Sequence, residues 1–129
     1  MSYLAERRVE EKERRRAEMV DAAEELYAAV GWDDVTMERV AKSARLSRAL
    51  LYVYFRDKND LLLAITERAL LELRERFVAA AAAHPLGIDQ VQAIGRAYVQ
   101  FQQEKPYRFD ACSRFHAHQT AGESADDAC

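Results

Sequence analysis

The sequence predicts an all-α fold, and three observations support this prediction. Ala, Leu, Glu and Arg are abundant, only four glycines and two prolines interrupt the 129 residues, and strand-like alternation is absent. Half of the residues are hydrophobic, which is enough for one ordinary core or somewhat more than one small core. The N-terminus is charged and no apolar run approaches the roughly 20 residues that span a bilayer, so we expect a cytoplasmic protein without a signal peptide or a membrane partner.

The first predicted helix runs from the charged N-terminal arm to Val30. Apolar residues recur along it every three or four positions and form one stripe suited to burial: Met19, Ala22, Ala23, Leu26, Tyr27 and Val30. Gly31 then ends the helix, because glycine adopts the left-handed backbone that follows many helix C-termini. We therefore expect this helix to bury its C-terminal half and to leave the arm in solvent.

Residues 36–62 predict two short helices with a tight joint. Thr36 and Ser47 are typical N-cap residues, since a hydroxyl accepts a hydrogen bond from an otherwise unpaired N–H of the first turn. Each cap is flanked by an apolar pair with the spacing of a hydrophobic staple, Val35 with Val40 and Leu46 with Leu51. The predicted helices run from Met37 to about Ala44 and from Arg48 to about Phe55. Neither can bury much surface alone, so the pair must dock on the first helix as a helix-turn-helix.

Three more helices are predicted after this unit. Asp57 and Asp60 resemble a capping box at the start of a long fourth helix, which continues to Ala83 and stops at His84-Pro85-Leu86-Gly87. The fifth helix carries Ile88, Val91, Ile94, Tyr98 and Phe101 and ends before Pro106, and the sixth covers Tyr107 to Phe115. We predict a helix-turn-helix domain with its N-terminal arm over residues 1–57, a second helical domain over 58–118, and an irregular tail over 119–129.

The charge distribution favours nucleic-acid binding only locally. The net charge is −3, yet residues 36–58 hold six basic and two acidic residues, a surplus of +4. A second basic group in the arm comprises Arg7, Arg8, Lys12, Arg14, Arg15 and Arg16, interleaved with Glu6, Glu10, Glu11 and Glu13. Two interpretations of the arm stay open, a solvated helix with many ion pairs or an arm that contacts DNA phosphates or the minor groove.

Catalytic and metal chemistry find little support in the sequence. Asp110, Cys112, His116 and His118 lie close enough to suggest ligands on one helix, but no paired CxxC pattern accompanies them, and an isolated cysteine on an apolar face is more often a core residue. No Gly-rich phosphate loop or nucleophile elbow is present. We predict no enzyme activity, no metal and no cofactor. Cys112 and Cys129 form no disulfide framework.

Residues 17 to 65 resemble the TetR family of transcriptional regulators. The resemblance rests on Gly31, Thr36, the turn Ala44-Arg45-Leu46-Ser47, the run Leu51-Tyr52-Val53-Tyr54-Phe55 and the start Lys58-Asn59-Asp60-Leu61. It implies a three-helix helix-turn-helix domain joined by a long fourth helix to a partial ligand-binding and dimerisation domain. Two departures stand out. Arg45 replaces the usual glycine, which implies a left-handed residue at a cost of about 1 kcal/mol. Leu50 and Val53 can touch a thymine methyl group but cannot hydrogen-bond a base edge.

Most candidate DNA contacts lie on the predicted third helix and its flanks. Arg48 alone among the groove-facing residues can make a bidentate contact to guanine, with a phosphate contact or a solvated side chain as alternatives. Tyr52 and Tyr54 can pack with their rings and donate to phosphate, with packing alone as the alternative. Leu46, Leu51 and Phe55 are expected in the core. The full set of candidate DNA-binding residues is Thr36, Arg45, Ser47, Arg48, Ala49, Leu50, Tyr52, Val53, Tyr54 and Lys58.

These features predict a sequence-specific regulator, most simply a repressor that a small-molecule effector releases from a double-stranded DNA operator. The resemblance implies a homodimer in the full-length protein, built by further helices that family members carry after the segment matched here. Three alternatives for this chain stay open: a fragment, a truncated product, or a chain from which some stretches are omitted. It also implies that a small, largely apolar effector contacts Leu70, Leu73, Phe77, Ile94, Tyr98 and Phe101, which alternatively form an ordinary core. The competing function is a helical ligand-binding or interaction protein with a degenerate helix-turn-helix.

Overall fold

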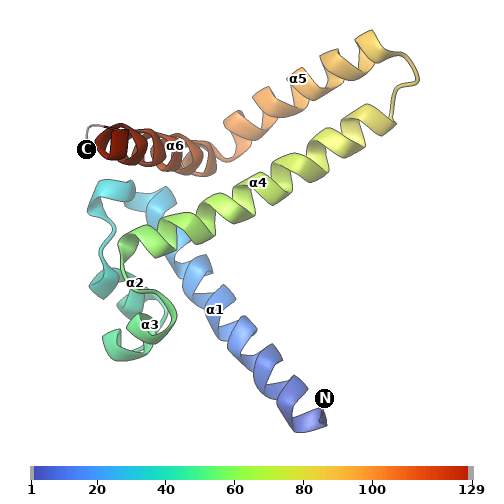
Figure 1. Ribbon diagram of the computed structural model, residues 1–129. Coiled ribbons are helices and arrows are strands. Elements are labelled where there is room, and N and C mark those ends of the chain that lie inside the picture. The colour runs from blue at the N-terminus through green and yellow to red at the C-terminus, as the bar shows by residue number, and fades with distance from the viewer. Residues whose placement is uncertain (1, 128–129) are drawn as a thin grey trace. The chain divides into compact units, whose positions relative to one another are not determined.

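The computed structural model of the protein describes the backbone of residues 2–127 and the side chains of residues 2–117. Within that range the chain forms six α-helices and one short 3-10 helix, which confirms the predicted all-α fold (Figure 1). The contacts divide the chain into two compact units, with the boundary between Leu61 and Leu62. The sequence predicts this boundary after residue 57, whereas in the structure the first turn of the fourth helix belongs to the first unit, where Leu61 is fully buried.

Helix α1 (Tyr3–Val30) includes the whole charged arm as well as the apolar stripe. Ser2 caps its start, accepting a hydrogen bond from the Ala5 N–H at 3.3 Å. Gly31 ends the helix with a φ of 81°, and its N–H donates to the Tyr27 carbonyl at 2.9 Å, as the sequence predicts. The C-terminal half is buried through Met19, Val20, Ala22, Ala23, Glu24 and Tyr27.

The remainder of the first unit is short and packs on the C-terminal half of α1. A single 3-10 turn, η1 (Trp32–Asp34), leads into α2 (Met37–Ser43) and α3 (Arg48–Tyr54). Tyr27 and Trp32 pack with ring centroids 5.0 Å apart. The core of the unit is completed by fully buried apolar side chains from α2, α3 and the first turn of α4: Val40, Leu51, Phe55 and Leu61.

The second unit contains most of α4 (Lys58–Ala82), α5 (Gly87–Glu104) and α6 (Pro106–Asp127). Helices α4 and α5 run in opposite directions on either side of the turn near Pro85 (Figure 1). The buried residues are mostly small, with Ala69, Ala93 and Ala111 alongside Ile65 and Phe101. The buried Thr66 hydroxyl donates to the Leu62 carbonyl at 2.8 Å and lies 3.4 Å from the Ala111 carbonyl, which links α4 to α6.

One predicted element is wrong. Helix α6 continues to Asp127, whereas the sequence predicts an irregular tail from residue 119. Residues 119–127 contain Ala and Glu but no proline, and a single internal glycine at 122 costs only about 1 kcal/mol, so nothing in the segment ends a helix. A polar composition therefore does not by itself indicate irregular structure. None of the helices within residues 2–127 is long and apolar enough to cross a membrane.

Candidate nucleic-acid interface

Local hydrogen bonds fix the geometry of the α2–α3 joint. The Thr36 hydroxyl accepts from the Arg39 N–H at 3.1 Å, and the Ser47 hydroxyl accepts from the Leu50 N–H at 3.1 Å, so both predicted caps are confirmed. At the start of α4, Asp57 accepts from the Asp60 N–H at 3.0 Å. Because each cap satisfies one donor of a first turn, these short helices begin at defined residues. The first residues of α3 are therefore held in a fixed position relative to α2.

The turn between α2 and α3 is a Schellman motif with Arg45 at its left-handed position. The Leu46 N–H donates to the Ala41 carbonyl at 2.9 Å, and the Arg45 N–H donates to the Lys42 carbonyl at 3.1 Å. This pair of bonds defines the motif and requires a positive φ between its two donors. Arg45 has a φ of 59° and is the one residue other than glycine with positive φ among those described, which confirms the predicted left-handed backbone.

Helix α3 has a buried side and an exposed side. Leu51 and Phe55 are buried, as predicted, while Leu46 is only half-buried. Arg48 and Ala49 are exposed, Leu50 is half-buried, Tyr52 is 44% exposed and Val53 is 73% exposed. Packing within the unit does not account for the largely exposed Val53 side chain. The exposed residues lie along one side of α3, and a major groove is wide enough to admit a single helix.

Lys58, which the sequence predicts as a DNA-binding residue, also makes contacts within the first unit. Its Nζ donates to the Trp32 carbonyl at 2.6 Å and lies 4.8 Å from the centre of the Trp32 ring. The ammonium group therefore ties the first turn of α4 to η1, a contact that no local pattern indicates, because the two residues are 26 positions apart.

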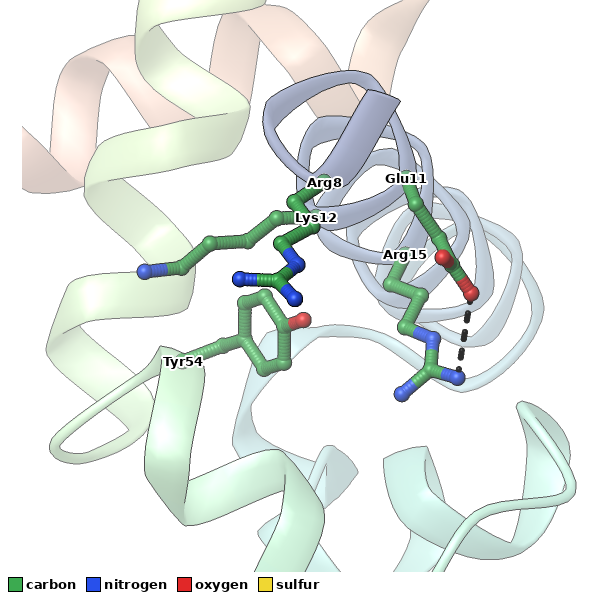
Figure 2. Close-up of a pocket in the computed structure, with 5 residues that line it drawn as sticks. All are labelled: Arg8, Glu11, Lys12, Arg15 and Tyr54. Carbon is green, nitrogen blue, oxygen red and sulfur yellow. Dashed lines mark hydrogen bonds and ion pairs between the residues drawn. The ribbon is translucent and has the colours of Figure 1, made fainter. Parts of the chain in front are cut away.

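A surface cavity of about 240 Å³ lies where the arm of α1 passes the end of α3. Arg8, Glu11, Lys12, Arg15 and Tyr54 line it, and Figure 2 shows the arm side chains leaving α1 on the side where Tyr54 lies. Arg15 donates to Glu11 at 3.4 Å. Next to this cavity the Arg16 guanidinium lies 5.2 Å from the centre of the Phe55 ring. The arm of α1 and the end of α3 thus line one surface cavity.

The predicted effector-contacting residues do not share a single environment. Phe77 and Tyr98 have ring centroids 6.4 Å apart, and Tyr98 packs edge-on against Phe109 at 5.9 Å. Leu73 and Ile94 are half-buried, Leu70 is 53% exposed, and Phe101 is fully buried beneath the Arg76 guanidinium. Within this chain Phe101 therefore acts as a core residue.

Other residues line two surface cavities among the described side chains of this unit. One, of about 450 Å³, lies against Leu71, Arg74, Glu75, Val78, Ala79 and Ala82. The other, of about 610 Å³, lies between α4 and α5 and is lined by Arg76, Ala79, Ala80, His84, Ala93, Arg96, Ala97, Gln100 and Glu104.

Glu72 is the centre of an ion-pair network in the second unit. Its carboxylate accepts from Lys105 at 2.8 and 3.0 Å, from Arg76 at 3.1 Å, and from Arg108. Burial raises the pKa of Glu72, but the hydrogen bonds and charges of these cations outweigh burial and bring the pKa below its ordinary value. Arg76 also donates to Glu104 at 2.6 Å. Only the i,i+4 spacing of Glu72 and Arg76 is visible in the sequence, because the other members lie far along the chain, at the end of α5, in the joint before α6 and in α6.

The Cys–His group of α6 does not assemble into a metal site among the described side chains. Asp110 accepts from Arg114 at 2.7 Å, His116 is exposed, and Cys112 is a half-buried free thiol whose pKa is raised by burial. His118 lies outside the described side chains. No cluster of three metal-ligating residues occurs in the part of the chain that the structure describes.

Comparison with known proteins gives matches that cover the first unit and, in the two relatives below, extend beyond it. Residues 19–65 match the model of the bacterial regulatory proteins of the tetR family. The regulator BetI of Rhizobium meliloti is 34% identical over 103 residues, covering 80% of this chain and 51% of BetI. An HTH-type regulator of Mycobacterium tuberculosis is 36% identical over 101 residues, covering 76% and 43%. The chain thus spans about half the length of these relatives.

Two solved structures share the fold. A TetR-like regulator from Rhodococcus sp. RHA1 superposes with a TM-score of 0.66 at 24% identity, covering 88% of this chain and 64% of that one. A TetR family regulator from Marinobacter aquaeolei VT8 gives a TM-score of 0.66 at 22% identity, covering 82% and 56%. At these identities the likeness concerns the fold alone.

Proposed function

The chain belongs to the TetR family of helix-turn-helix transcriptional regulators, and we propose that it binds a duplex DNA operator through α2 and α3 and represses transcription by occupying that operator. The observation that supports this most is the exposed side of α3. A capped, Schellman-closed joint holds this helix rigidly, yet Arg48, Tyr52 and Val53 point to solvent rather than into the unit. Base recognition requires polar and apolar side chains that are held rigidly in position to contact the base edges.

The protein would act as a homodimer when full length, with the two copies of α3 in successive major grooves about 34–36 Å apart or a multiple of that distance. The test is selection of bound sequences from random duplex DNA, followed by footprinting on the selected site. We expect a palindrome whose half-sites are both protected on one face of the duplex. An unpaired half-site would contradict the dimer, and no protection at low salt would contradict DNA binding itself in favour of a degenerate helix-turn-helix.

Arg48 is proposed to read a base, whereas the tyrosines position the protein on phosphates. Arg48→Ala should relax preference at one base pair of each half-site, costing about 1–3 kcal/mol on the selected sequence and little on a random one. Tyr52→Phe, which removes a hydroxyl from the same helix, should instead weaken both sequences by one common factor. If the two variants give the same ratio of operator to random affinity, this division of roles is mistaken.

Regulation by a small, largely apolar effector is proposed for the second unit, with Phe77 and Tyr98 as the aromatic contacts. Helix α4 supports a link between effector and DNA, since its first turn belongs to the DNA-binding unit and the rest of it to the second unit. An effector that prefers the DNA-incompetent state by about 1–3 kcal/mol would lower operator affinity about 5- to 150-fold, and operator DNA must weaken effector binding by the same factor. Calorimetry with and without saturating operator measures this reciprocity. If the affinity for the effector is the same with and without saturating operator, α4 does not couple the two sites and has a purely structural role.

A further inference from the structure

The arm of α1 separates its charges onto two opposite faces. Each residue of an α-helix turns about 100° from the last, so Arg8, Lys12 and Arg15 fall within about 60° of one another. By the same count Glu6, Glu10 and Glu13 fall within about 60° of one another on the opposite face. Acidic and basic residues are interleaved along the sequence, but the turn of the helix places them on opposite faces. The first set is called the basic face below.

Ion pairs do not neutralise the basic face. Among the described side chains of the arm, Arg15 pairs with Glu11 at 3.4 Å and Arg14 pairs with Glu18 at 3.9 Å, whereas Arg8 and Lys12 lie within ion-pair distance of no acidic group. Both pairs are exposed, and pairs of that kind contribute little. Ion pairs between residues four positions apart therefore do not account for the charges of this arm. Its charges are arranged for something outside the helix.

The basic face also has a defined position on the first unit. Together with Tyr54 at the end of α3 it lines the surface cavity of about 240 Å³ (Figure 2). Arg16 continues the line of cations by lying over the buried Phe55 ring at 5.2 Å. The Tyr54 hydroxyl and three long cationic side chains thus line one surface cavity at the end of α3, together with Glu11, whose carboxylate accepts from Arg15. These donors match a phosphodiester, whose oxygens accept hydrogen bonds from the hydroxyl and from the cations.

We propose that the basic face of α1, with Tyr54, binds the DNA backbone beside the major groove that α3 occupies. This inference rests on the proposed DNA-binding function and adds to it a second, sequence-independent contact surface. The acidic face on the far side of the helix would be repelled by DNA, so the arm can lie against the duplex in one orientation only. The contact would raise affinity for every sequence equally, because phosphates carry no sequence information.

The experiment compares two double variants that remove the same charge from different faces. Arg8→Gln with Lys12→Gln removes two cations of the basic face, and Arg7→Gln with Arg14→Gln removes two cations about 120° around the same helix. Affinity is measured against salt for the selected operator and for a random duplex of about three helical turns. Each lost phosphate contact lowers the slope of log affinity against log salt by about 0.9, so the basic-face variant should lose about 1.8.

Raising salt from about 50 to about 200 mM should then weaken the wild type about tenfold more than the basic-face variant, on both duplexes. The matched control should keep the wild-type slope. Hydroxyl-radical footprints should show protected sugars next to each half-site that disappear only in the basic-face variant. Circular dichroism of both variants confirms that the helix is intact.

Equal loss of slope in both variants would overturn the proposal, because it would show a general effect of net charge. No change in either variant, while the wild type still protects a palindrome, would also overturn it and leave the proposed function standing. A wild type that binds neither duplex would refute both. A changed base preference in the selected site would refute the sequence-independent role of the basic face.

Discussion

The left-handed Arg45 allows strain and charge to be measured separately at one position. A residue with a Cβ pays about 1–2 kcal/mol for this conformation, and glycine does not. Glycine in turn adds about 0.4–1 kcal/mol of conformational freedom to the unfolded chain. Arg45→Gly should therefore be more stable than Arg45→Ala by about 0.5–1 kcal/mol, because both lack the charge and only alanine keeps the φ of 59° under strain. For a domain of this size the difference is about 2–6 °C in Tm.

Urea and thermal unfolding followed by circular dichroism measure this difference. Arg45→Ala itself should lie within about 0.5 kcal/mol of the wild type, since the side chain is exposed. Both variants should bind operator several-fold more weakly than the wild type and by similar amounts, because both lose one cation of the local basic surplus. Equal midpoints for the glycine and alanine variants would refute the strain. Equal DNA affinity for all three proteins would refute the phosphate-facing role of Arg45.

Three further outcomes are expected from single substitutions. Lys58→Met should lower the free energy of unfolding by about 1–2 kcal/mol, because it removes the hydrogen bond from Nζ to the Trp32 carbonyl. An unchanged unfolding midpoint would show that Lys58 does not stabilise the fold, and DNA binding would remain as its role. Glu72→Gln should cost about 1–3 kcal/mol near neutral pH. Since its folded pKa is depressed, that contribution is present above the ordinary value of 4.5 and is lost as pH falls through the folded pKa, so wild type and variant should converge in acid unfolding. Ser47→Ala should cost about 0.5–2 kcal/mol and speed hydrogen exchange at the Leu50 amide, whereas Ser47→Thr should retain the protection.

The features that the sequence predicts well are those closed by bonds between near neighbours. Thr36 and Ser47 cap residues three positions away, and Arg45 completes a motif that spans six residues. At Thr36, Ser47 and Gly31 the residue type itself indicates the geometry, whereas the left-handed backbone of Arg45 is predicted from its place in the turn, because arginine disfavours that conformation. Gly31, with a φ of 81°, ends α1 at the predicted position.

The features that the sequence misses depend on partners far along the chain or on missing stop signals. The Lys58 ammonium finds the Trp32 carbonyl across 26 positions, and Glu72 finds Lys105 across 33. Such pairs follow from the packing of whole helices, which residue spacing does not describe. The predicted helix α6 is too short because a polar composition does not by itself indicate irregular structure, and the segment contains no proline or other stop signal that would end a helix.

The unfavourable features of the first unit gather on the surface proposed to meet DNA. Arg45 holds a strained backbone, Val53 is 73% exposed, and the unpaired cations Arg8 and Lys12 lie on one face beside Tyr54. The strain at Arg45 and the repulsion between like charges four residues apart lower the stability of the free protein, and the exposed Val53 side chain lowers its solubility. Such features persist where a function uses them. A degenerate helix-turn-helix would have no reason to keep them together on one side of a unit whose other side is well packed. DNA supplies a single partner for all of them: phosphates for the cations, and thymine methyl groups for the exposed valine.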